Sequence, residues 1–152
     1  MNIFTLGLTL FWLRFTEPPE QIALNYFASK ILDQNYAGKT LYFSGQTEAN
    51  ANITGPFARC FESDSTFSKF YYSHRETELG NLSLDFTEVP NLRKAVKARP
   101  KQLNLEIYRA TPNDIVTYVY IKVFKEKHFA DHYLLKIESD DIVDVCYMNE
   151  IM

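Results

Sequence analysis

The sequence predicts an α+β fold, in which an N-terminal helix packs on a curved antiparallel sheet that ends in a C-terminal four-strand meander. Three observations lead to this prediction. Apolar residues recur at helical spacing between Pro18 and Gln34, apolar and polar residues alternate from Gln102 onward, and short turns separate the alternating segments. The chain has 152 residues, of which 46% are hydrophobic, and we expect residues 16–152 to form a single domain.

The first fifteen residues differ from the rest of the chain. Residues 3–13 carry no charge, and Arg14 and the run Thr16-Glu17-Pro18-Pro19 follow them. A run this short fits the apolar region of a signal peptide, whereas a membrane span needs about 20 residues. We therefore expect residues 1–15 to be a signal or targeting segment, the chain to be secreted or periplasmic, and no stable membrane span. The run has no basic residue before it and no A-x-A site after it, which leaves a native strand or helix in a cytoplasmic protein as the alternative.

The N-terminal helix is predicted from Pro18 to Gln34. Thr16 is a suitable N-cap, and the two prolines fit a first turn that needs no amide hydrogen. The apolar positions at helical spacing are Ile22, Ala23, Tyr26, Phe27 and Ile31.

The middle of the chain predicts shorter elements. Residues 40–44 form a short strand with Leu41 and Phe43 on one face, and residues 45–55 form a polar loop. Two short helices are predicted at residues 67–74 and after Pro90, and a half-buried strand lies between them at residues 82–86. The apolar residues of these elements are Phe67, Phe70 and Tyr71, then Leu82, Leu84 and Phe86, then Leu92, Ala95 and Val96.

The C-terminal third of the chain predicts an antiparallel meander. Its strands are residues 103–108, 115–124, 132–137 and 142–148, with turns at residues 111–114, 125–127 and 139–141. In the second strand, Val119 and Ile121 alternate with Tyr118 and Tyr120, so both faces carry apolar groups. We expect this strand to be central and covered on both sides.

The order of these elements resembles the cystatin-like and NTF2-like α+β folds, in which a curved sheet wraps around a helix. The resemblance covers most of the chain after Glu17 and consists of element order alone, without a family motif. These folds host ligand-binding, protein-binding and enzymatic members, so the resemblance does not select a function.

Several classes of function are disfavoured. The net charge of −3 and the absence of aromatics near the basic run argue against a nucleic-acid partner. The sequence contains no glycine-rich phosphate loop, G-x-S-x-G elbow, H-E-x-x-H motif or C-x-x-C motif, so we expect no cofactor and lean away from an enzyme.

The histidines and cysteines predict no metal centre or nucleophile. His128 and His132 are four residues apart with Asp131 between them, but in a strand this spacing puts them about 13 Å apart, so we expect no metal site. Cys60 and Cys146 are the two cysteines. We expect two buried free thiols, with a disulfide as the alternative, and we disfavour Cys60 as a thiolate nucleophile.

Two groups of residues are candidate binding sites. The basic run consists of Arg93, Lys94, Lys97, Arg99 and Lys101, which is either a solvated helix face or a contact for an acidic partner. The aromatic and polar residues Tyr71, Tyr118, Tyr120 and His132 either line a ligand pocket or belong to the core.

The function that we expect is that of a small, non-catalytic, exported binding or accessory domain whose partner is a small molecule or a protein. One alternative is a hydrolase or isomerase that uses acid–base chemistry, with His132 and Glu106 as the pair. The other alternative is a protein-interaction module that uses the basic run.

Overall fold

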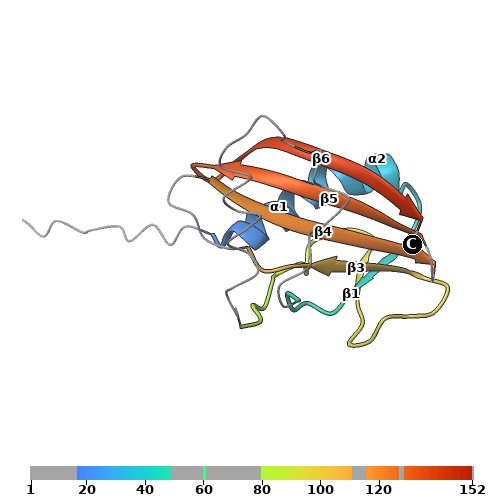
Figure 1. Ribbon diagram of the computed structural model, residues 1–152. Helices are drawn as coiled ribbons and strands as arrows, with labels where there is room; N and C mark the ends of the chain where they lie inside the picture. The colour runs from blue at the N-terminus through green and yellow to red at the C-terminus, as the bar shows by residue number, and fades with distance from the viewer. Residues whose placement is uncertain (1–16, 49–59, 61–79, 111–115, 127–128, 152) are drawn as a thin grey trace, which may run out of the picture.

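The computed structural model describes residues 17–48, 60, 80–110, 116–126 and 129–151, and they form one helical segment and a six-stranded sheet (Figure 1). The strand order is β2-β1-β3-β4-β5-β6. The strands are β1 (Leu41–Phe43), β2 (Leu92–Lys94), β3 (Leu103–Ile107), β4 (Val116–Glu126), β5 (Phe129–Glu138) and β6 (Asp141–Ile151). No helix of the described residues is long and apolar enough to cross a membrane.

The predicted N-terminal helix is confirmed. It consists of α1 (Pro19–Tyr26), a π-helical turn η1 (Phe27–Leu32) and α2 (Asp33–Asn35), which follow one another without a break. Pro18 is the N-cap and makes no side-chain cap hydrogen bond, while Thr16, the cap predicted from the sequence, lies outside the described residues. After Tyr36, Gly38 has a φ of +69°, which favours glycine and turns the chain toward β1.

The predicted C-terminal meander is also confirmed, since β3, β4, β5 and β6 pair antiparallel in chain order. The sheet as a whole is mixed, because β1 runs parallel to both β2 and β3. The prediction of a wholly antiparallel sheet was therefore wrong. Whether two neighbouring strands run parallel or antiparallel depends on the path of the chain that connects them. The alternation of side chains is the same in both cases, so it does not predict strand direction.

Two further predictions need correction. The expected helix after Pro90 is wrong, since Leu92–Lys94 forms β2 and Val96 is 83% exposed. The expected strand at residues 82–86 is reduced to a single bridge between Gln46 and Ser83, although Leu84 is buried between exposed neighbours. At residues 92–94, tertiary pairing with β1 overrides the local helical pattern. The predicted helix at residues 67–74 lies outside the described residues.

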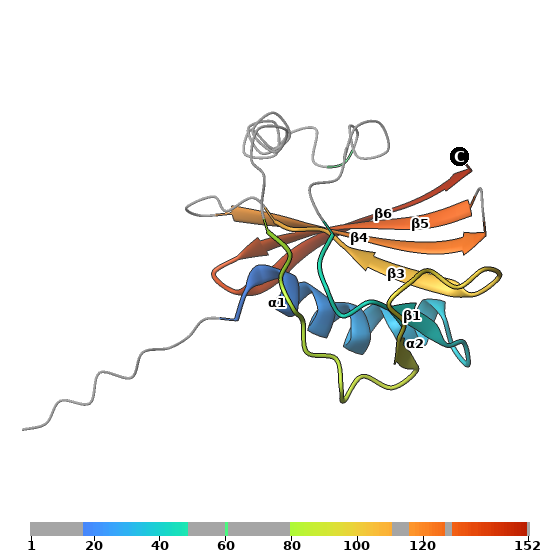
Figure 2. The ribbon, with the colours of Figure 1, turned by 90° about the horizontal axis from the view of Figure 1, so that it is seen from below.

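β4 carries buried side chains on both of its faces, as its pattern predicted. The helical segment lies along one face (Figure 2), where Val119, Ile121 and Val123 of β4 join the larger core. On the opposite face, called the outer face below, Tyr118 and Tyr120 of β4 belong to a second cluster. The other buried members of that cluster are Cys60, Val116 and Leu134.

Candidate functional site

The candidate site is a group of five residues on the outer face, called the outer-face cluster: Glu106, Tyr108, Tyr120, Lys122 and His132. The register of the sheet brings them together. Glu106 of β3 pairs with Lys122 of β4, and Lys122 pairs with His132 of β5, so the three lie in one row across the sheet. In the adjacent row, the Tyr108 amide donates to the Tyr120 carbonyl at 2.9 Å. Side chains opposite one another in such rows are about 5 Å apart at Cβ.

Three rings of the cluster form a stack. The rings of Tyr108 and Tyr120 are 4.7 Å apart between centroids and inclined by 14°. The Tyr120 ring is 6.0 Å from the His132 ring and nearly parallel to it. A hydrogen bond of 2.8 Å joins Tyr120 Oη to His132 Nδ1. Two of these three side chains, Tyr120 and His132, are buried, so neighbouring side chains hold the stack against this face of the sheet.

Glu106 marks the accessible end of the stack, where Tyr108 Oη donates a hydrogen bond of 2.7 Å to Glu106 Oε2. Burial raises the pKa of the Glu106 carboxyl, and the nearby Glu48 carboxylate raises it further, while the Tyr108 hydrogen bond and the Lys122 ammonium act in the opposite direction. Burial also raises the pKa of the Tyr108 hydroxyl, and its hydrogen bond to Glu106 adds to the effect. The end of the stack therefore presents a carboxyl group whose pKa lies above its ordinary value because it is partly buried.

The residues predicted from the sequence as ligand-binding lie partly in this cluster. Tyr118, Tyr120 and His132 share the outer face, and they are 1%, 7% and 2% exposed. These three side chains are therefore part of the packed layer on this face, whereas Tyr108 and Glu106 are more exposed. Tyr71 lies outside the described residues. The half-buried Tyr108 was not singled out from the sequence, although it continues the alternation of Glu106 along β3.

The acid–base pair proposed from the sequence is His132 and Glu106. The two residues share a face and a row, but Lys122 lies between them, so their backbones are two strand spacings, or about 10 Å, apart. His132 bonds to Tyr120, whereas Glu106 accepts from Tyr108.

A second polar cluster lies on the helix-facing side and was not predicted. Asp131 of β5 is 2% exposed, and its carboxylate accepts hydrogen bonds from Tyr36 Oη at 2.6 Å, Tyr147 Oη at 3.0 Å and Asn149 Nδ2 at 2.9 Å. Tyr36 also bonds to Tyr133 Oη at 2.9 Å. Burial, followed by the bond to Asp131, raises the pKa of the Tyr36 hydroxyl well above its usual range. The alternation of Asp131 with Tyr133 along β5 was the one sequence signal for this cluster.

A buried carboxylate also anchors the helix to the end of β3. Glu20, which is 1% exposed, accepts a hydrogen bond of 2.9 Å from the Ala110 amide and lies 3.2 Å from Arg109 Nε. An acidic residue in the first turn of a helix complements the helix dipole. Here Glu20 faces inward and fixes the position of α1 on the sheet.

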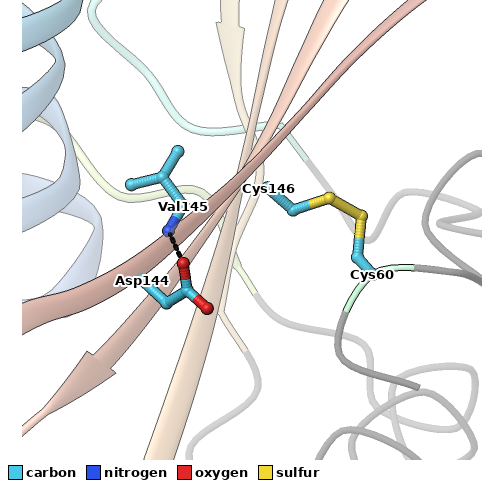
Figure 3. The surroundings of a disulfide bond; sticks show 4 residues. All are labelled: Cys60, Asp144, Val145 and Cys146. Atoms are coloured by element: carbon cyan, nitrogen blue, oxygen red, sulfur yellow. Dashed lines mark hydrogen bonds between the residues drawn. A yellow bond between two sulfur atoms is a disulfide. The ribbon is translucent and has the colours of Figure 1, made fainter. Parts of the chain in front are cut away.

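Cys60 and Cys146 form a disulfide, with their Cα atoms 6.0 Å apart (Figure 3). The expectation of two free thiols was therefore wrong, and Cys60 is not a thiolate nucleophile. Cys146 projects from β6 on the side opposite to Val145, and Cys60 packs beside Tyr118 and Tyr120 on the outer face. The bridge spans 86 residues, a contact that no local pattern records.

The basic run does not lie on a helix. Arg93 and Lys94 belong to β2, Arg99 is placed over the Tyr42 ring at 4.6 Å, and all five members of the run are exposed. Among the described residues, no three His, Cys, Asp or Glu side chains are grouped so that they could hold a metal ion. His128 lies outside them.

Comparisons with protein-family models, with curated proteins and with solved structures find no match. The resemblance to the cystatin-like and NTF2-like folds therefore stays a prediction.

Proposed function

We propose that this chain is a non-catalytic binding domain of an extracytoplasmic compartment, and that it binds a small molecule at the accessible end of the outer-face cluster. The observation that carries the proposal is the stack of Tyr108, Tyr120 and His132, which ends in the half-buried carboxyl of Glu106. Preorganised aromatic side chains beside one oriented polar group are the usual composition of a small-molecule site. A ligand with a ring for Tyr108 and a hydrogen-bonding group for Glu106 fits this arrangement.

The disulfide supports the assigned compartment. Structural disulfides persist where the surroundings are oxidising and are rare in the cytosol of most organisms. The bridge also holds Cys60 against Tyr118 and Tyr120. The packing of these two tyrosines on the outer face therefore depends on the two cysteines being oxidised. Rapid alkylation of thiols in cells that produce the protein tests this point. Blocked, unreactive cysteines support export, and two alkylated cysteines contradict it.

A small-molecule screen tests the binding site. We expect ligands found by NMR with the oxidised wild-type protein to shift the resonances of Glu106, Tyr108 and Lys122. Their affinity should fall about tenfold in Tyr108→Leu, which removes the accessible ring. Tyr26→Leu, a half-buried tyrosine of α1, is the matched control and should leave affinity unchanged. Ligands that bind both variants equally would contradict the proposed site.

An acid–base enzyme is the second candidate, favoured by the Tyr120–His132 hydrogen bond and by the raised pKa of Glu106. It requires a substrate that spans the distance between His132 and Glu106. The matched pair His132→Gln and Glu106→Gln tests this, because both variants must lose turnover of any substrate found.

The basic run stays an alternative for protein contact, and loss of partner capture in the charge-reversed variants of Lys94 and Lys97 would support it.

A further inference from the structure

The last strand of the sheet has a long edge that no other described strand pairs with. β6 covers Asp141–Ile151 and, among the described residues, has a neighbouring strand on one side only. None of its described side chains is buried, whereas Ala130–Leu135 of the adjacent β5 are all buried. Val143 and Tyr147 are about half exposed, at 50% and 51%. An edge of this length is a template for pairing with another chain unless charges, prolines or bulges protect it.

The protection of this edge is uneven. The register between β5 and β6 skips Val143, because Lys136 pairs with Asp144 and Ile137 pairs with Ile142. This bulge interrupts pairing near the β5–β6 turn. From Asp144 onward the register is regular, and the sequence has no proline there. The regular part of the edge therefore offers a continuous row of main-chain groups.

One main-chain group at the edge is covered by a carboxylate. Asp144 Oδ1 accepts a hydrogen bond of 2.8 Å from the Val145 amide (Figure 3). Because this amide bonds to a side chain of its own strand, we take it to point away from β5. Main-chain groups alternate in direction along an antiparallel strand, so those of Tyr147 and Asn149 point the same way. These three residues define the pairing edge.

The charge of β6 selects the occupant. The segment from Asp141 to Ile151 contains three acidic residues and no Lys, Arg or His. Asp140 and Asp144 are exposed, whereas Glu138 at the end of β5 is paired with Lys136 at 3.0 Å. A second copy of β6 would bring two acidic edges together, which opposes self-pairing. An extended segment with Lys or Arg at alternate positions complements this edge.

We propose that the outer edge of β6 binds an extended, basic segment of a partner protein as a seventh strand. The incoming strand pairs with the main chain of Val145, Tyr147 and Asn149 and displaces the Asp144 carboxylate from the Val145 amide. Asp144 then pairs with a cation of the partner, while Tyr147 contacts an apolar side chain. This surface is separate from the outer-face cluster, so the two proposals can fail independently.

The test uses the oxidised full chain and a blocked peptide of about eight residues, in which Lys alternates with Val and Thr. A counterpart with Glu in place of each Lys is the control peptide. We expect the basic peptide to bind at least about tenfold more tightly, with weaker binding at high salt. The amides of Val145, Tyr147 and Asn149 should gain protection from hydrogen exchange when it binds.

Variants sharpen the test. Asp144→Lys should reverse the preference toward the acidic peptide, and Asp33→Lys, an equal charge change on exposed α2, should leave it unchanged. The thermal midpoint of each variant verifies folding. Equal affinity for both peptides, peptide-induced protection outside β6, or a peptide-independent dimer that protects β6 in the wild-type protein would each overturn the proposal.

Discussion

Removal of the Cys60–Cys146 disulfide is expected to affect the stability of the domain strongly. The bridge joins residues 86 positions apart. Closing a loop of that length removes chain entropy from the unfolded state, and the loop-closure relation gives a stabilisation of about 4.6 kcal/mol at 25 °C. Whole domains have free energies of unfolding of roughly 5–15 kcal/mol. The double variant Cys60→Ala, Cys146→Ala should therefore lose about a third or more of its stability.

Guanidinium denaturation followed by far-UV circular dichroism measures this difference. The thermal midpoint should fall by about 10–18 °C, because each kcal/mol corresponds to roughly 2–4 °C for a chain of this size. Wild-type protein reduced with dithiothreitol is the matched control and should behave like the double variant. The double variant itself should not respond to dithiothreitol.

The entropic reasoning would be refuted if oxidised and reduced wild-type protein differed by less than about 1 kcal/mol. That result would mean that the constraint on the unfolded chain is offset in the folded state. Hydrogen exchange adds a local readout. Loss of the bridge should reduce protection at Tyr118 and Tyr120, which pack beside Cys60, more than at Val119, which faces the helix.

Three further predictions concern the buried polar groups. Tyr36→Phe removes a buried hydrogen-bond donor to Asp131 and should lower the free energy of unfolding by about 1.5–3 kcal/mol, measured by urea denaturation. A loss below about 0.5 kcal/mol would show that the remaining donors satisfy the carboxylate. Glu20→Ala leaves Arg109 and the Ala110 amide without their carboxylate partner and should lower the free energy of unfolding by about 3–5 kcal/mol. A loss no larger than that of the exposed control Glu17→Ala would contradict a buried ion pair. The pKa of Glu106 is raised from its ordinary value of 4.5 in the folded state, so the stability linked to its protonation is present below pH 4.5 and is lost as pH rises through the folded pKa. Glu106→Gln should therefore stabilise the protein more at pH 7 than at pH 4, and a gain that does not change with pH would refute this.

The elements that could be predicted from the sequence are those whose signal lies within one segment. The helix from Pro19 to Asn35 and the strands of the meander follow from which side chains recur on one side of a single segment. The segment at Leu92–Lys94 was mispredicted, because its apolar residues fit a helical face when neighbouring strands are ignored. Pairing with β1 supplies main-chain hydrogen bonds that outweigh this preference.

The candidate site was predicted less completely than the fold. Tyr118 and Tyr120 were placed on one face by alternation, and the register of β5 adds His132 to that face. The partnership of Glu106 with Tyr108 was missed, although both residues lie in a strand that was predicted. Asp131 was considered as a metal ligand beside histidines, whereas the helix brings Tyr36 to it.

By itself, the sequence determined the helix, the strands of the meander and the burial of β4 on both faces, because each follows from the period of apolar side chains along one segment. Only the tertiary structure decided the strand order and direction, the bond between Cys60 and Cys146, and the polar groups that meet Asp131 and Glu20. These features depend on contacts between segments far apart in the chain. Such a contact does not require apolar residues to recur at a regular spacing in either segment. It therefore cannot be recognised from the sequence of one segment alone.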